Sequence, residues 1–171
     1  MRKLCGAAAI LLGCLGAALG RLRSKKERIL LLRSLAASLL ELRGELSERQ
    51  RSLGDCFRSL AEKNEGDTVG AFYAALCAEL RGLGERRFSE IWRAAAESCF
   101  ARTTEAVLDT LCPLGVLLGG SELERQCEAL ERAARRIERE AEAERSALRD
   151  ERRLCLGLSL SAGAFLVIML M

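Results

Sequence analysis

Residues 121–148 read SELERQCEALERAARRIEREAEAERSAL, and this stretch predicts a long amphipathic helix. Its apolar residues recur with heptad spacing, which is typical of a narrow stripe that packs against another helix. They are Leu123, Cys127, Leu130, Ala134, Ile137, Ala141 and Leu148. Charged residues fill the other positions and include Glu–Arg pairs four residues apart, which support a helix. The stretch therefore predicts an all-α protein.

The start of this helix carries its own signal. Ser121, followed three residues later by Glu124, forms a capping box in which each side chain can accept a hydrogen bond from the other residue's N–H. The small Ala134 and Ala141 would allow close approach of another helix, which we expect to be the first long helix, running antiparallel. A coiled-coil dimer through the same stripe is the alternative.

Glycines and short polar clusters divide the chain between its apolar ends into six predicted helices. The breaks fall at Gly44, 64–67, 82–84, 102–104 and 119–121. The first helix, from about Arg21 to Arg43, carries a wide leucine-rich face. The fifth begins near Thr104 and contains Pro113, whose missing N–H should kink or restart it.

The second, third and fourth predicted helices supply core residues at three- and four-residue spacing. They are Cys56, Phe57, Leu60 and Ala61; then Val69, Phe72, Leu76 and Leu80; then Phe88, Ile91, Trp92, Ala95 and Cys99. Trp92 is interpreted as a large buried anchor of the bundle, with stacking on a ligand as the alternative. Leu130 and Ile137 are the corresponding anchors of the last helix.

Uncharged segments at both ends predict membrane-spanning helices. Residues 4–19 lie between basic residues, a pattern that short spans share with signal sequences. Residues 154–171 form a second uncharged run of bilayer-crossing length, which a secreted protein would not need. We therefore predict spans over 1–20 and 154–171 around a helical bundle over 21–153.

The charge distribution bears on topology and partners. Apart from Arg2 and Lys3, all of the 27 Lys and Arg and the 24 Asp and Glu lie within 21–153. Basic residues adjoin the bundle side of both apolar segments, which predicts a cytoplasmic bundle held in the cell membrane, with the lipid bilayer as one partner. Acidic and basic residues are nearly equal in number and interleaved, so nucleic acid is not an expected partner.

Few residues favour catalysis or metal binding. The chain has no histidine, and its eight cysteines include no C-x-x-C pair, so we expect free thiols in a reducing compartment and no metal site. No glycine-rich loop is followed by Lys-Ser/Thr, and the acidic residues lie mainly beside arginines on exposed helix faces. We expect a protein that is not an enzyme and uses no cofactor.

Residues 114–126, LGVLLGGSELERQ, match the pattern L-G-x-x-L-G-x-S-[DE]-x-E-x-Q ahead of a long charged helix. In this respect, and in the order of its helices and apolar ends, the chain resembles the stage III sporulation protein AB family. The motif residues that we single out as structural or as a partner contact are Leu114, Gly115, Leu118, Gly119, Ser121, Glu122, Glu124, Arg125 and Gln126. One departure lies at 42–46, where the family's nearby proline-containing turn is missing.

The resemblance implies a six-helix bundle similar to the domains of the type II secretion inner-membrane platform protein. It also implies a role in endospore formation, in a channel assembly of the mother-cell membrane. The implied partners are other membrane subunits and a cytoplasmic secretion-type ATPase. A general bitopic adaptor or coiled-coil scaffold is the alternative function, and a membrane enzyme would require a buried pair of carboxylates.

The motif itself has two interpretations. In the structural one, Gly119 or Gly120 supplies a left-handed helix C-cap and Ser121 begins the next helix. In the functional one, the same turn is an exposed corner offered to a partner. The two interpretations are compatible.

Overall fold

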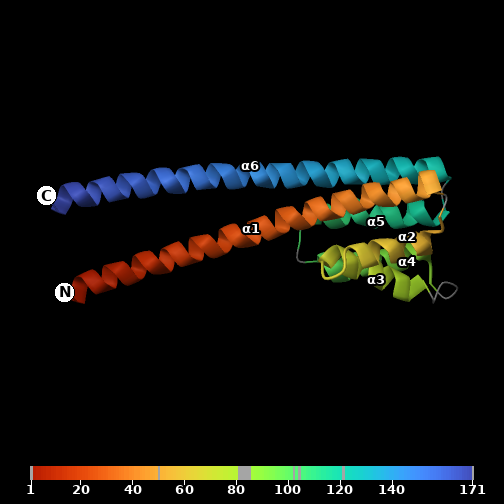
Figure 1. Ribbon diagram of the computed structural model, residues 1–171, viewed down its shortest axis with the longest axis horizontal. Coiled ribbons are helices and arrows are strands. Elements are labelled where there is room, and N and C mark those ends of the chain that lie inside the picture. Colours follow the sequence, from red (N-terminus) through yellow and green to blue (C-terminus); the bar gives the residue numbers. More distant parts are fainter. Residues whose placement is uncertain are drawn as a thin grey trace. The chain divides into compact units, whose positions relative to one another are not determined.

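The computed structural model describes the backbone of residues 2–49, 51–80, 86–101, 103, 105–120 and 122–170, and the side chains among them at 20, 22–48 and from 51 to 151. These residues form six α-helices and no strand (Figure 1), so the all-α prediction is confirmed. The helices are α1 (Arg2–Arg49), α2 (Leu53–Lys63), α3 (Thr68–Glu79), α4 (Phe88–Phe100), α5 (Glu105–Gly120) and α6 (Leu123–Leu170).

The chain divides into two compact units. The central unit is Leu30–Glu140, and the terminal unit combines Met1–Ile29 with Ala141–Met171, so α1 and α6 contribute to both. Within the central unit, α2 packs on α3, α3 on α4 and α4 on α5. In the same unit α1 and α6 run antiparallel (Figure 1), and an ion pair of 3.5 Å joins Arg43 to Glu131.

The terminal unit contains the remaining parts of the two long helices. Arg28 pairs with Glu144 at 2.7 Å, and Lys25 pairs with Glu151. As residue numbers fall on α1 they rise on α6, so the pairing is antiparallel here too. In each unit, ion pairs therefore join the last helix to the first in the predicted antiparallel direction.

The core of the central unit is aromatic on one side and leucine-rich on the other. Trp92, Phe57, Phe72, Tyr73 and Phe100 are all fully buried. Ring centroids of Phe72 and Trp92 lie 5.1 Å apart with an edge-on angle of 84°, one of the arrangements that aromatic rings favour. On α1 the buried residues follow helical spacing at Leu32, Leu35, Leu39, Leu42 and Leu46.

The predicted break at Gly44 is wrong, and of the kink or restart predicted at Pro113 the restart is wrong. Gly44 does not end the first helix, because Leu42, Glu45 and Leu46 continue the buried face through it and α1 reaches Arg49. Pro113 does not restart the fifth helix, which is continuous from Glu105 to Gly120. Pro113 and Asp109 are both exposed, so water can satisfy the Asp109 carbonyl that lacks an N–H partner.

The predicted stripe of α6 is buried from Leu130 onward, at Leu130, Ala134, Ile137, Ala141 and Leu148. Its first residue, Leu123, is instead 44% exposed, because it opens the helix at the end of the bundle. The helix begins with the Glu122 carbonyl accepting from the Gln126 N–H at 3.1 Å. Ser121, and with it the predicted capping box, lies outside the described residues.

In the described part of the chain, no helical segment has both the length and the apolarity that a bilayer crossing requires. The predicted spans at 1–20 and 154–171 fall almost entirely on residues whose side chains lie outside that part. The two spans, and the domain boundaries drawn from them, therefore stay predictions.

Candidate functional site

The inward half of the 114–126 motif packs α5 tightly against α4. A Cβ atom placed on Gly115 would lie 2.8 Å from the Cβ of Trp92 and 2.9 Å from its indole ring, closer than real side chains approach. One turn further, a Cβ on Gly119 would lie 3.2 Å from the Phe88 ring. The two glycines therefore form a notch on α5 that receives two aromatic side chains of α4.

The indole of Trp92 is also fixed in orientation. Its Nε1 donates a hydrogen bond of 2.7 Å to the backbone carbonyl of Leu111. A buried indole N–H without a partner would reduce the stability of the fold, and this hydrogen bond avoids that loss. The indole also contacts the rings of Phe57, Phe72 and Phe88, and it is fully buried with no face open to a ligand.

Other motif residues hold the end of α5. Leu114 and Leu118 are 3% and 2% exposed, so they belong to the core. The side-chain amide of Gln126 donates to the Leu118 carbonyl at 3.3 Å, which satisfies one of the carbonyls left without a partner at a helix C-terminus. The start of α6 is thereby tied back onto the end of α5.

The outward half of the motif faces solvent. Glu122, Glu124 and Arg125 are exposed, and Glu124 lies in the first turn of α6, where a carboxylate complements the helix dipole. Two large apolar side chains are also exposed nearby in the chain, Val116 at 64% and Leu123 at 44%. We call Val116, Glu122, Leu123 and Arg125 the α5–α6 corner.

The predicted left-handed C-cap is wrong. Gly119 and Gly120 both lie inside α5, and among the described glycines only Gly66 has a positive φ, of 86°. At 119 the absence of a side chain leaves space beside Phe88, and the backbone there is helical. Gly120 has nothing within 4 Å of an added Cβ, so space does not require a glycine there.

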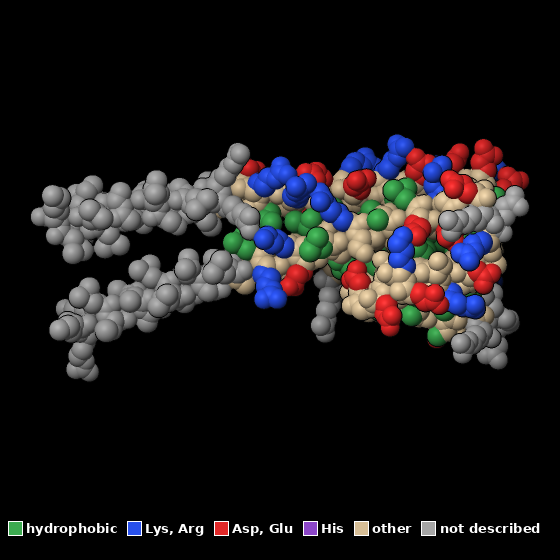
Figure 2. Space-filling model, viewed as in Figure 1, with side chains coloured by type: hydrophobic (Ala, Val, Ile, Leu, Met, Phe, Trp, Pro, Cys, Tyr) green, Lys and Arg blue, Asp and Glu red, His purple; other side chains and the backbone are tan. Residues whose placement is uncertain are grey.

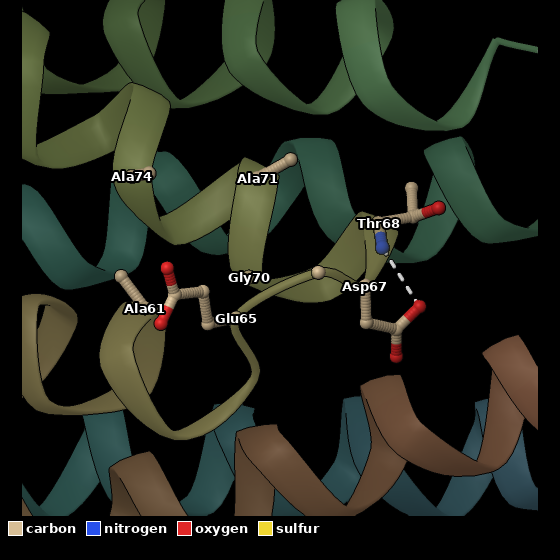
Figure 3. Close-up of a pocket in the computed structure, with 8 residues that line it drawn as sticks. Ala61, Glu65, Asp67, Thr68, Gly70, Ala71 and Ala74 are labelled. Atoms are coloured by element: carbon tan, nitrogen blue, oxygen red, sulfur yellow. Dashed lines mark hydrogen bonds between the residues drawn. The ribbon is translucent and has the colours of Figure 1, made fainter.

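A shallow hollow of about 520 Å³ lies where α2 turns into α3. Small residues line it, together with the carboxylates of Glu65 and Asp67 (Figure 3). Asp67 is occupied structurally, since it accepts from the Thr68 N–H at 2.7 Å and from the Ser34 hydroxyl at 3.1 Å. A Cβ on Gly70 would lie 2.0 Å from the Asn64 carbonyl oxygen, so the hollow reflects a close helix–helix turn.

Two helix caps and two buried polar contacts were missed in the sequence. The Ser52 hydroxyl accepts from the Asp55 N–H at 3.3 Å and caps α2, and the spacing Ser-x-x-Asp is the signal that could have revealed it. Asp67 caps α3 in the same sense. The buried Tyr73 hydroxyl lies 3.1 Å from the Ser38 hydroxyl, and the buried Glu45 pairs with Arg51 at 2.7 Å.

The ionisable groups that are perturbed are structural. Burial raises the pKa of the Tyr73 phenol well above its ordinary value of 10.0, and it also raises the pKa values of the Cys56 and Cys112 thiols. A raised thiol pKa disfavours the reactive thiolate. The described cysteines are free, and among the described residues no group of three or more His, Cys, Asp and Glu is placed to hold a metal ion.

Comparison with known proteins assigns the chain to one family. No curated protein and no solved structure matches it. A family model, described as stage III sporulation protein AB, matches residues 3–171 and so covers nearly the whole chain, including the glycine-notched α5 and the start of α6. The chain therefore belongs to the stage III sporulation protein AB family and is a sporulation-related protein.

Proposed function

We propose that the protein is a non-catalytic platform subunit of a channel or secretion-like assembly, anchored in the mother-cell membrane during endospore formation. The observation that carries the proposal is the family match over residues 3–171 of a chain whose two long helices extend into uncharged segments. A folded bundle carried by two membrane helices presents a surface to partners, which is the property that a platform needs.

The two spans are part of this proposal. The backbone of α1 is helical through the uncharged residues 4–19, and that of α6 is helical through 154–170. Helical backbone satisfies its own hydrogen bonds, as a segment in lipid must. Basic residues on the bundle side of both segments favour a cytoplasmic bundle.

The α5–α6 corner is the surface that we propose contacts a partner, either a neighbouring membrane subunit or a cytoplasmic secretion-type ATPase. It combines exposed apolar side chains at Val116 and Leu123 with charges at Glu122 and Arg125, a mixture typical of interface anchors and their rims. The fold beneath it is rigid, because the glycine notch and the Gln126 bond hold α5.

Deletion of the gene in its spore-forming host tests the role. Vegetative growth should be normal, while heat-resistant spores should fall by several orders of magnitude, with arrest after engulfment. A growth defect in cells that never sporulate would instead favour the general adaptor.

Complementation of the deletion then tests the α5–α6 corner. The double variant Glu122→Arg/Arg125→Glu should keep the melting temperature but restore few spores and capture less of the partner.

The matched control reverses two exposed charges elsewhere on α6, in Arg136→Glu/Glu138→Arg. It should restore sporulation fully. Full complementation by the corner variant would place the partner contact elsewhere on the bundle.

A further inference from the structure

The net charge of the bundle is near zero, but positive and negative charges are concentrated in different parts of the chain. Basic residues exceed acidic ones by five in the two segments next to the uncharged ends, 21–28 and 144–153. The basic members are Arg21, Arg23, Lys25, Lys26, Arg28, Arg145, Arg149, Arg152 and Arg153, and the acidic members are Glu27, Glu144, Asp150 and Glu151. The intervening residues 29–143 hold 16 Lys and Arg against 20 Asp and Glu and are therefore acidic overall.

The terminal unit brings these two basic segments side by side. The ion pairs Lys25–Glu151 and Arg28–Glu144 join α1 to α6 and place both segments at one level of the helix pair. Figure 2 shows Lys and Arg side chains gathered where the described side chains of α1 begin and those of α6 end. The carboxylates at 144 and 151 are used within the pair, which leaves other cations facing outward.

Among the described side chains of this region, three basic ones remain available. Lys26 and Arg149 are exposed, and neither makes an ion pair or hydrogen bond to another described residue. Arg23 is 85% exposed and has only a surface pair with Glu27 at 3.2 Å, of a kind that contributes little stability. We call Arg23, Lys26 and Arg149 the basic collar.

The helical backbone fixes how far the collar lies from the uncharged segments. At 1.5 Å per residue, Arg23 and Lys26 lie about 6 and 11 Å along α1 from Leu19, and Arg149 lies about 8 Å along α6 from Leu154. The headgroup layer of a bilayer is roughly 5–8 Å thick on each side. Long basic side chains can direct their charges towards it.

We propose that the basic collar binds the phosphate-bearing headgroups of anionic phospholipids, and this inference rests on the two membrane spans of the proposed function. The occupant follows from charge and position, because the collar is cationic and adjoins the uncharged helical segments. The acidic remainder of the bundle would be repelled by the same headgroups. Anionic lipid therefore binds the terminal unit beside the uncharged segments.

Electron paramagnetic resonance of spin-labelled phosphatidylglycerol and phosphatidylcholine, in bilayers containing the full chain, tests the inference. The motionally restricted lipid at the protein should favour phosphatidylglycerol by roughly threefold or more. The variant Arg23→Gln/Lys26→Gln/Arg149→Gln should reduce this preference by at least about half. Salt at about 1 M, where the Debye length is about 3 Å, should do the same for the unmodified chain.

The matched control removes three exposed positive charges from the central unit, in Arg93→Gln/Arg132→Gln/Arg136→Gln, and should keep the preference. Equal loss in the control, or an undiminished preference in the collar variant, would overturn the inference while leaving the spans intact. The absence of any motionally restricted lipid would show that the chain does not enter the bilayer, and the proposed anchoring would fail as well.

Discussion

The contact between α4 and α5 and the pairing of α1 with α6 are specified by different features of the sequence. The first depends on missing side chains, since Gly115 and Gly119 leave room for Trp92 and Phe88. The second depends on a repeated pattern, with leucines on α1, Leu130, Ala134 and Ile137 on α6, and a surface ion pair at the edge. Shape specifies the α4–α5 contact, and the period of apolar residues specifies the α1–α6 pairing. An added methyl group should therefore disturb the first, and a buried charge should disturb the second.

The largest loss of stability is expected when a charge is placed on the buried apolar stripe of α6. Ile137 is 1% exposed, and Ile137→Glu would bury a carboxylate among apolar groups, which should reduce the free energy of unfolding by at least about 3 kcal/mol. Thermal unfolding of the full chain, followed by the fluorescence of its single tryptophan, measures this. Arg136→Glu, next to it but exposed, should cost no more than about 0.5 kcal/mol. Equal losses would mean that the buried face of α6 is misassigned.

An intermediate loss of stability is expected at the contact between α4 and α5. Gly115→Ala would push a methyl group into Trp92, and overpacking of this kind costs about 1–3 kcal/mol. The emission of Trp92 should shift as its ring moves. Gly120→Ala offers the matched control, because open space surrounds Gly120 and alanine favours a helix by up to about 1 kcal/mol over glycine. If Gly115→Ala proved as stable as Gly120→Ala, the notch would not be needed for packing.

The smallest effect is expected at the polar contact between α3 and α1. Tyr73→Phe removes the contact with Ser38 of α1 and should cost about 1 kcal/mol at neutral pH. Burial raises the pKa of Tyr73, so above pH 10 the unfolded phenol ionises while the folded one stays neutral, and this lowers the stability of the unmodified chain. The melting-temperature gap between the two proteins should therefore narrow between pH 8 and about pH 10.5. A gap that widened would contradict this.

Periodicity explains how much could be predicted. The helical class and the α6 stripe from Leu130 onward follow from apolar spacing, and the division into six helices follows from glycines and polar clusters; a sequence displays both directly. The sequence predicts the end of α1 too early, because Gly44 looks like a break. In the structure the buried face continues at Leu42 and Leu46 and outweighs the weak helix propensity of one glycine. Tertiary packing overrode a local signal.

The sequence identifies residues 114–126 as the candidate site, but it does not predict which residues of other helices they contact. The spacing of Gly115 and Gly119 does not reveal that Trp92 and Phe88 fill the space above them, since this depends on how α4 crosses α5. For the same reason the sequence suggests a backbone cap at Gly119 or Gly120 rather than a notch for an aromatic ring. The Gln126 bond to Leu118 likewise spans a turn whose geometry no local pattern specifies.

The fit of Trp92 against Gly115 also constrains how the family can evolve. Because the indole fills the volume that a side chain at 115 would need, mutations at the two positions are not independent events. A larger residue at 115 becomes tolerable only after 92 has become smaller, whereas a smaller residue at 92 leaves a void that a later change at 115 can fill. The order of substitution is therefore restricted, and related sequences should change the two positions together.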